Sequence, residues 1–374
     1  MKYIPQQVLA LEALAYLGRR AAGYDNTWLM ERLKAQGVSD LEAICVQTAP
    51  VAQLSAILDS QVPTEDGLLN QVFGNLAGFP YNTVGTYSPG FLLLYPLVET
   101  CDDDPQKLLT LARQRPAERL AGDLALMLNL AEDSSQQQEM ACDEFSSRVL
   151  AMSIPAESKV AILDLLHHGE QVLEDAVSLV GKAISCLEQQ RQLLELCCQP
   201  FHQQVSQSDP QTFLSQTSAL RSEVQDCLVR PFVFGLETLL ASNPLPGQPV
   251  TVYCGILRQP LQSALASARG PEYDVYNAIK LLADRTRFDI LCYLRDHDAY
   301  GQELAAKFGL SRNTIHHHMT KLLDAHMVKC TVDGNRIYYT VDQQTLSSLL
   351  DRQRKLLIPD EAPGLSQQSE ARYL

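Results

Sequence analysis

The chain has 374 residues, of which 46% are hydrophobic and 20% charged, and its formal net charge is −14. This length exceeds the needs of one small domain and predicts two or three domains with ample hydrophobic core. The acidic balance excludes a chain-wide affinity for nucleic acid. No apolar run approaches the roughly 20 residues that cross a bilayer, and residues 1–18 have the pattern of an ordinary helix rather than a signal peptide. We therefore expect a cytoplasmic protein without a membrane segment.

Residues 1–227 are expected to form a large helical region. Apolar residues recur there at three- and four-residue spacing, which is typical of amphipathic helices. Gly37 and Pro63 are expected to separate neighbouring helices, since glycine and proline both interrupt helical structure. Such helices are predicted over 4–18, 27–35, 40–58, 105–115 and 117–130.

A segment rich in glycine, proline and aromatic residues, 74–90, interrupts this helical pattern. A long aromatic loop in a helical domain is a candidate wall of a small-molecule pocket. Rings of this kind also simply pack where helices cross, and this alternative stays open. The candidate pocket residues are Phe79, Tyr81, Tyr87, Phe91 and Tyr95.

Residues 156–199 are predicted to form one long helix or two helices divided near Gly169, as part of a helical bundle. His167 and His168 lie within this stretch. Neighbouring residues on a helix diverge by about 100°, so the two imidazoles are not expected to share a metal ion.

Ten cysteines are scattered along the chain without any C-x-x-C pair. Cys197 and Cys198 are the only adjacent pair. We interpret the cysteines as buried thiols, because free cysteine packs as a small hydrophobic residue. A redox switch at this pair is the alternative.

Residues 228–270 change in character. The segments 229–234 and 250–255 are rich in β-branched and aromatic residues, and they flank a Pro- and Gly-rich stretch at 243–249. They predict a small β element, for which a hairpin is one form, followed by a linker.

Two short helices are predicted after residue 300. Leu304, Ala305 and Phe308 repeat at helical spacing, and Gly309 is expected to end that helix. Ser311 is a good N-cap for a second helix. The buried stripe of the second helix is predicted to be Ile315, Met319, Leu322 and Leu323. Two helices joined by so short a glycine turn form a helix-turn-helix.

The opposite face of the second helix is polar. Asn313, His316, His317 and Thr320 occur at i, i+3, i+4 and i+7 and should project together. An α-helix fits the major groove, where such side chains read base edges. His318 lies over the apolar stripe and is expected to be packed and hydrogen-bonded.

A β-hairpin is predicted directly after this helix. β-forming residues at 328–332 and 336–341 flank the turn Asp333-Gly334-Asn335, and Lys329 and Arg336 are expected to bracket its tip. A hairpin in this place is a wing. The candidate DNA contacts are Ser311, Arg312, Asn313, Thr314, His316, His317, Thr320, Lys321, Lys329 and Arg336.

The charge is unevenly distributed. Residues 271–358 hold 12 Lys and Arg against 11 Asp and Glu, whereas the rest of the chain holds 18 against 33. The acidity therefore belongs to the N-terminal portion and the DNA face is local. We expect DNA affinity to fall steeply with salt.

The helix-turn-helix followed by a wing resembles the winged helix-turn-helix domain of the ArsR-type transcriptional regulators. The matching segments are LADRTRFDILCYL at 282–294, ELAAKFGLSRNTIHHHMTKLLDAHMV at 303–328 and DGNRIYY at 333–339. The resemblance covers about 85 residues, 273–357, and implies a dimeric DNA-binding repressor or activator. Metal-sensing members carry Cys-x-Cys in the first helix of the motif, or Asp, His and Glu ligands in the last helix. Neither GQELAAKF nor QQTLSSLLDRQRKLL holds such a set, so we predict no metal and no cofactor.

Apolar stripes on the helices that flank the winged core predict a homodimer. Two-fold symmetry would place two recognition helices about one DNA turn apart, and this predicts a palindromic operator. The candidate dimer residues are Val275, Tyr276, Ile279, Leu346, Leu349 and Leu350.

These observations predict a mainly α protein. Its parts are a helical sensor or interaction region at 1–227, the β-containing element and linker at 228–270, the winged domain at 271–358 and a disordered tail at 359–374. The predicted function is regulation of transcription at double-stranded DNA, with the N-terminal region sensing a small molecule or a partner. The alternative is an interaction or scaffold protein whose N-terminal region only supports dimerisation. No P-loop, G-x-S-x-G, H-E-x-x-H or dinucleotide fingerprint occurs, so an enzyme is not expected.

Overall fold

The computed structural model describes residues 2–38, 40–79, 83–128, 130, 139–207, 227–242, 249–268, 271–310, 312–325, 327–333 and 336–358. Helices dominate these residues, and two separate hydrophobic cores form among them. The larger core contains buried residues between Leu9 and Leu261, and the smaller one contains buried residues between Val275 and Leu349. The mainly α fold class is therefore confirmed.

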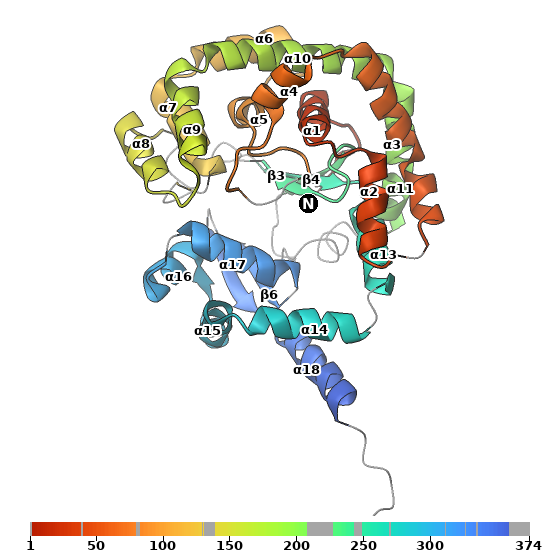
Figure 1. Ribbon diagram of the computed structural model, residues 1–374, viewed down its shortest axis with the longest axis vertical. Coiled ribbons are helices and arrows are strands. Elements are labelled where there is room, and N and C mark those ends of the chain that lie inside the picture. Colours follow the sequence, from red (N-terminus) through yellow and green to blue (C-terminus); the bar gives the residue numbers. More distant parts are fainter. Residues whose placement is uncertain are drawn as a thin grey trace, which may run out of the picture.

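The N-terminal helices enclose the larger core, and Figure 1 shows them curving around helix α1. They are α1 (Leu9–Ala21), α2 (Asn26–Ala35), α3 (Glu42–Gln61), α4 (Asp66–Phe73), α5 (Pro89–Leu94), the 3-10 helix Tyr95–Leu97, α6 (Pro105–Gln114), α7 (Ala117–Met127), α8 (Cys142–Leu150), α9 (Ala156–His168), α10 (Glu170–Gln189) and α11 (Arg191–Gln207).

Helix α1 lies at the centre of this core. Every residue from Leu9 to Arg19 is buried, and the helix packs against α10, α4 and α5. Gly18 permits one of the closest approaches, because a Cβ there would lie 2.4 Å from the carbonyl oxygen of Val84. A larger residue at this position would push α1 away from that segment.

Four strands complete the N-terminal core in the order β1-β2-β4-β3. They are β1 (Lys2–Tyr3), β2 (Cys227–Phe232), β3 (Leu239–Ala241) and β4 (Val250–Gly255). The first three in this order run parallel, and β3 is antiparallel to β4. The hairpin prediction is therefore wrong, because β2 and β4 are parallel neighbours with Cys227 beside Val250. Parallel strands need a crossover rather than a tight turn.

The stretch predicted as one or two helices over 156–199 contains parts of three. Helix α9 ends at His168 and α10 begins at Glu170, so the division near Gly169 is confirmed. A second break follows at Gln190, before α11. The chain therefore turns twice here, at Gly169 and Gln190, and does not extend as one rod.

Glu12 in α1 fixes the segment that follows β2. Its carboxylate is buried and accepts hydrogen bonds from the backbone N–H groups of Val233 at 2.8 Å and Phe234 at 2.9 Å. Burial raises the pKa of Glu12 to about 8, outweighing the lowering effect of the two hydrogen bonds. Helix α1 and the loop after β2 are thus held together.

Helix α13 (Arg258–Ala268) leads from β4 to the winged part of the chain. That part contains α14 (Pro271–Leu282), α15 (Arg285–Leu294), β5 (Ala299–Tyr300), α16 (Gly301–Phe308), α17 (Arg312–Asp324), β6 (Val328–Asp333), β7 (Arg336–Val341) and α18 (Gln343–Leu357). Its three strands form an antiparallel sheet in the order β5-β7-β6.

Candidate nucleic-acid interface

Helices α16 and α17 form the predicted helix-turn-helix. Gly309 lies between them with φ 63°, in the left-handed region that commonly ends helices. The N–H of Leu310 then donates to the carbonyl oxygen of Ala305 at 3.1 Å. The direction in which α17 leaves this turn therefore depends on a conformation that glycine adopts at little cost.

The apolar stripe of α17 holds the helix against the smaller core. Ile315, Met319 and Leu322 are each at most 1% exposed, and Leu323 packs partly buried beside them. This stripe was predicted from spacing and is confirmed. Because these side chains occupy one side of the helix, the residues on the opposite side face outward.

The outward side of α17 carries polar groups. Thr314, His317 and Thr320 are exposed and Lys321 is half-buried. Burial, then the charges of Lys321 and Arg287, lower the pKa of His317 below its ordinary value. Its imidazole is therefore neutral near pH 7 and offers one donor and one acceptor. Such a face can contact both phosphate oxygens and base edges.

Asp284, Arg287 and His318 connect three helices of the winged core. Asp284 caps α15 by accepting from the backbone N–H of Arg287 at 3.0 Å, which is the main cause of its lowered pKa. Nε of Arg287 donates to the carbonyl oxygen of Leu281 at the end of α14 at 2.8 Å. Nδ1 of His318 lies 3.9 Å from Oδ1 of Asp284. Asp284 and Arg287 thus join the start of α15 to the end of α14, and His318 of α17 lies beside Asp284.

His318 was expected to be both packed and hydrogen-bonded. Its side chain is 12% exposed, so the packing is confirmed. Its Nδ1 is buried without a hydrogen-bond partner in the described part of the chain, so the hydrogen bond is not present at that atom. Burial lowers the pKa of His318, and the nearby Asp284 only partly opposes this effect.

The wing is an antiparallel hairpin of β6 and β7. Asp333 and Arg336 pair at its tip, whereas Lys329 pairs with Thr340 close to its base. The prediction that Lys329 flanks the tip is therefore wrong. The spacing from the turn puts it next to α18, where its Nζ lies 2.7 Å from Oδ2 of Asp342.

Asp342 also caps α18, accepting from the N–H of Thr345 at 3.2 Å. Burial works to raise the pKa of Asp342, but the hydrogen bonds from Lys329 and Thr345 outweigh it and leave the pKa lowered. Lys329 is consequently engaged in holding α18 to the wing. Sequence spacing missed this role, although an aspartate immediately before a helix is a recognisable capping signal.

Several candidate DNA contacts cannot be placed as side chains. Ser311 lies outside the described residues, and so do the side chains of Arg312, Asn313, His316 and Arg336. The backbone of the last four belongs to α17 and β7.

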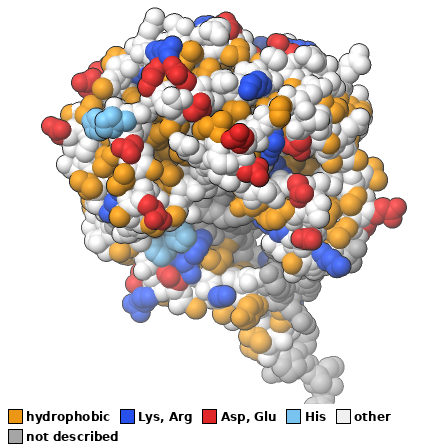
Figure 2. Space-filling model, turned by 45° about the horizontal axis from the view of Figure 1, so that its top comes forward, with side chains coloured by type: hydrophobic (Ala, Val, Ile, Leu, Met, Phe, Trp, Pro, Cys, Tyr) orange, Lys and Arg blue, Asp and Glu red, His pale blue; other side chains and the backbone are white. Residues whose placement is uncertain are grey.

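Figure 1 shows α17 on the edge of the winged domain nearest the N-terminal helices, with α14 and α18 farther away. In Figure 2, histidine and basic side chains lie together near the boundary between the two parts, and acidic and basic side chains are interspersed over the larger part.

The helices predicted to dimerise pack against each other in one chain, α14 on α18. Val275 and Leu349 are 4% and 5% exposed and pack in the smaller core of this chain. The assignment of the two helices to a dimer stays a prediction. Tyr276 remains 63% and Leu350 57% exposed.

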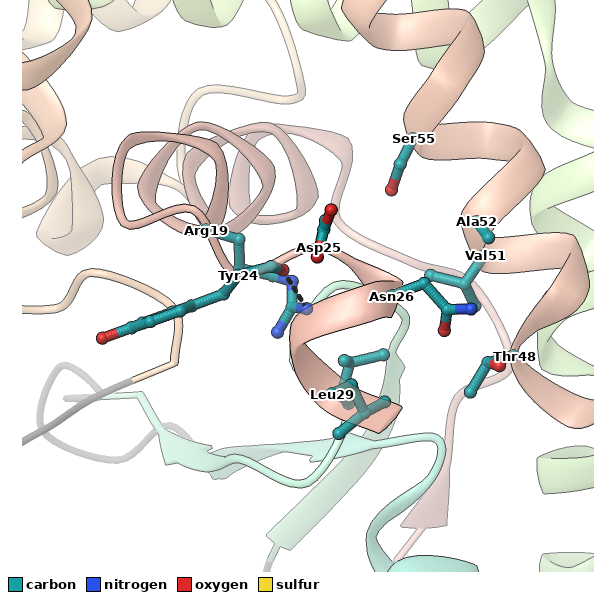
Figure 3. A pocket seen from close by; sticks show the side chains of 10 residues that line it. Arg19, Tyr24, Asp25, Asn26, Leu29, Thr48, Val51, Ala52 and Ser55 are labelled. Atoms are coloured by element: carbon teal, nitrogen blue, oxygen red, sulfur yellow. Dashed lines mark hydrogen bonds between the residues drawn. The ribbon is translucent and has the colours of Figure 1, made fainter. Parts of the chain in front are cut away.

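The aromatic residues predicted to line a pocket pair with each other. Phe79 stacks on Tyr87 with centroids 4.5 Å apart, and Phe91 stacks on Tyr95 at 5.0 Å. Tyr81 lies outside the described residues. The pocket that the structure describes has other walls (Figure 3). A ligand site among these rings stays a prediction.

Cys197 and Cys198 are buried and not joined by a disulfide. Burial raises the pKa of both thiols, that of Cys197 to about 12. A raised pKa keeps the reactive thiolate scarce, which favours the structural interpretation. Cys45 and Cys292, in contrast, are exposed. Among the described residues, no three His, Cys, Asp or Glu side chains gather as a metal site.

The core, turn and hairpin define a winged helix-turn-helix protein. The model of the bacterial regulatory protein, arsR family, matches residues 284–329. The chain is 31% identical over 72 residues to the arsenical resistance operon repressor of Staphylococcus aureus, covering 19% of this chain and 69% of that protein. This chain belongs to the arsR family of bacterial regulatory proteins.

Two further relatives match over similar lengths. The HTH-type transcriptional regulator KmtR of Mycobacterium tuberculosis is 30% identical over 76 residues, which are 20% of this chain and 58% of that relative. The transcriptional repressor SdpR of Bacillus subtilis is 29% identical over 75 residues, which are 20% of this chain and 83% of SdpR. This chain thus spans little more than half of one relative, and no solved structure matches it.

Among the described residues, no helix is both long enough and apolar enough to span a membrane.

Proposed function

We propose that this protein is a DNA-binding transcriptional regulator that inserts α17 into the major groove of a palindromic operator. The observation that carries the proposal is the exposed row of Thr314, His317 and Thr320 opposite a fully buried apolar stripe. A helix held so firmly on one side can present the other side to base edges without loss of order. The names of the related proteins, which are regulators and repressors, support the same function.

The exposed apolar side chains of α14 and α18 support a homodimer formed through these two helices. Tyr276, Leu350 and Leu357 are 63%, 57% and 68% exposed, and Ile279 is 38% exposed. Water-exposed apolar residues concentrated on two adjacent helices are typical of an interface between copies. We propose that a second copy covers them, which would set two α17 helices on one face for a two-fold operator.

Sensing by the N-terminal region is the third part of the proposal. In Figure 1, α17 lies on the edge of the winged domain nearest the N-terminal helices. A DNA duplex bound along α17 would therefore need space close to those helices. DNA binding would then require the winged domain to turn relative to the larger part. A ligand with different affinities for the two arrangements would shift their populations, so we propose regulation by a small molecule or a partner.

The rival function is an interaction protein whose N-terminal region only supports the dimer. The extensive packing of the larger core, with α1 buried along its length, is the observation that favours it. The two functions differ in one respect: only the regulator changes its operator affinity when a ligand binds.

Capture of genomic DNA fragments by the full-length protein tests the proposed function. We expect enrichment of a few sites, and footprinting of each should reveal two half-sites about one helical turn apart. A single asymmetric half-site, bound by a monomer in sedimentation, would contradict the palindrome and the dimer. Capture of no specific fragment would contradict DNA-binding regulation itself.

A further inference from the structure

We propose that the pocket between α1, α2 and α3 is the effector site and that it binds a small zwitterion of the α-amino acid class. This inference rests on the proposed function, since it gives a site and a ligand chemistry to the N-terminal sensor. The pocket is open to solvent, and the space of about 300 Å³ in and around it includes solvent outside its walls (Figure 3). It is lined by Arg19, Tyr24, Asp25, Asn26, Leu29, Thr48, Val51, Ala52, Ser55 and Leu236.

Arg19 supplies the anion-binding group. It lies in the last turn of α1 and is only 7% exposed. Its Nη2 donates to the backbone carbonyl of Tyr24 at 2.5 Å, which orients the guanidinium at the pocket wall. Guanidinium has five N–H donors in a planar fork that matches a carboxylate. A site with low local dielectric strengthens that attraction.

Asp25 supplies the opposite charge on the same wall. It is exposed and accepts a hydrogen bond from the N–H of Trp28 at 2.7 Å, capping α2. The negative charge of Asp25 would repel an anionic group at the N-terminus of α2. A ligand with two negative charges is therefore disfavoured in this pocket. A molecule that carries a carboxylate for Arg19 and an ammonium for Asp25 satisfies both charges.

Neutral polar groups complete the site. Thr48 is 2% exposed and its hydroxyl donates to the carbonyl oxygen of Cys45 at 3.2 Å, so the hydroxyl oxygen can act only as an acceptor toward a ligand. Asn26 and Ser55 stand on the same walls, as Figure 3 shows. Apolar contact comes from Leu29 and Val51. This mixture suits a short side chain rather than a long or aromatic one.

The pocket is connected to the helix that leads to the winged domain. Leu236 lines the pocket with φ 45°, an uncommon conformation for a leucine. Its carbonyl oxygen accepts from the N–H of Leu257 at 2.9 Å. Glu237, the next residue, makes two further contacts. Its carbonyl oxygen accepts a hydrogen bond from Arg258 at 2.7 Å, and its side chain forms an ion pair with Arg32 of α2. Helix α13 begins at Arg258.

A ligand against Leu236 therefore touches the loop that carries α13. Ligand binding would favour one position of this loop, and the position of α13 would follow. Coupling of this kind between two sites typically changes affinity 5- to 150-fold. We expect the bound ligand to alter operator affinity within that range.

Calorimetry on the full-length protein tests the site with glycine, alanine and serine as probes, and with acetate and methylammonium as the two half-molecules. We expect at least one amino acid to bind more tightly than either half. Arg19→Gln should abolish that binding. Ala52→Leu, which fills the pocket without changing a polar group, should weaken it at least tenfold, whereas Gln53→Leu on the exposed side of α3 should not.

Binding that survives both pocket variants, or no binding of any amino acid at millimolar concentration, would overturn the site. Operator binding measured with and without the bound amino acid then tests the coupling, and an unchanged affinity would overturn the effector role. The two failures are distinguishable from failure of the proposed function, because ligand binding is measured without DNA and operator binding is first measured without ligand.

Discussion

His318 Nδ1 lies 3.9 Å from Oδ1 of Asp284, across the boundary between the recognition helix and the start of α15. Asp284 is bound more closely by α15 itself, through the N–H of Arg287. The hydrogen bond that caps α15 is therefore the main interaction of this carboxylate, and its contact with His318 of α17 is the weaker one. Asp284 therefore lies where the start of α15 meets the packed side of α17.

Replacement of Asp284 tests this arrangement. We expect Asp284→Ala to lower the free energy of unfolding of the winged domain by about 1 kcal/mol, because the α15 cap is lost. Asp284→Asn should retain most of this stability, since asparagine caps helices about as well as aspartate. Urea unfolding of the three proteins measures the difference. Equal losses in both variants would show that the charge, and not the cap, is what matters.

Gly309 provides a test of the turn. A Cβ there would meet no atom within 4 Å, so any cost of Gly309→Ala comes from its φ of 63°. We expect a loss of about 1–2 kcal/mol. Gly301→Ala is the matched control, because a Cβ there also meets nothing and its φ is not positive. Thermal unfolding compares them, and similar melting temperatures for the two variants would contradict the expectation.

The winged domain could be predicted from sequence because its signals are local. A glycine after an apolar stripe, the period of α17 and the turn at 333–335 each act over a few residues. The N-terminal topology could not be predicted in the same way. Strand β1 pairs with β2 across more than 220 residues of chain, with Lys2 beside Leu228, and no short pattern specifies that partner.

The candidate site shows the same limit. Exposure along α17 followed from helical period, but the pairing of Lys329 with Asp342 depends on the register of the wing against α18. The pocket walls likewise come from α1, α2, α3 and the loop at Leu236. A set of residues so dispersed has no sequence pattern that composition or spacing could reveal.

The two lysines near the interface should contribute differently to DNA binding. Lys329 is paired with Asp342, whereas Lys321 lies half-buried on α17. We expect Lys321→Gln to reduce the slope of log affinity against log salt by about 0.9, the value for one lost phosphate contact. Lys329→Gln should leave the slope unchanged. Fluorescence anisotropy across a salt series measures both, and a reduced slope for Lys329→Gln would place that lysine on the phosphates instead.

Glu12 should make the stability of the larger core fall as pH rises from about 4.5 to about 8. Its folded pKa of about 8 lies above the ordinary value of 4.5. A raised pKa contributes stability that is complete below 4.5 and is lost as pH rises through about 8. We expect the unfolding free energy to fall over this range by up to about 1.4 kcal/mol per pH unit.

Glu12→Gln removes the titrating group and should flatten that dependence. The variant also replaces one acceptor with an NH₂ group opposite a backbone N–H, so its stability near pH 5 should be lower by about 1–3 kcal/mol. Guanidinium unfolding at pH 5, 6.5 and 8 records both effects. A wild-type curve that stays level over this range would refute the role assigned to the buried carboxylate.

The most direct test of the DNA-binding function is operator affinity after Thr314, His317 and Thr320 are all changed to alanine. All three are exposed, so the fold should persist, which circular dichroism can verify. Base contacts are worth about 1–3 kcal/mol each, and we therefore expect binding at least about 100-fold weaker. Alanine at His167 and His168, two exposed histidines on α9, is the control and should leave affinity unchanged. Undiminished operator binding by the triple variant would contradict recognition by α17.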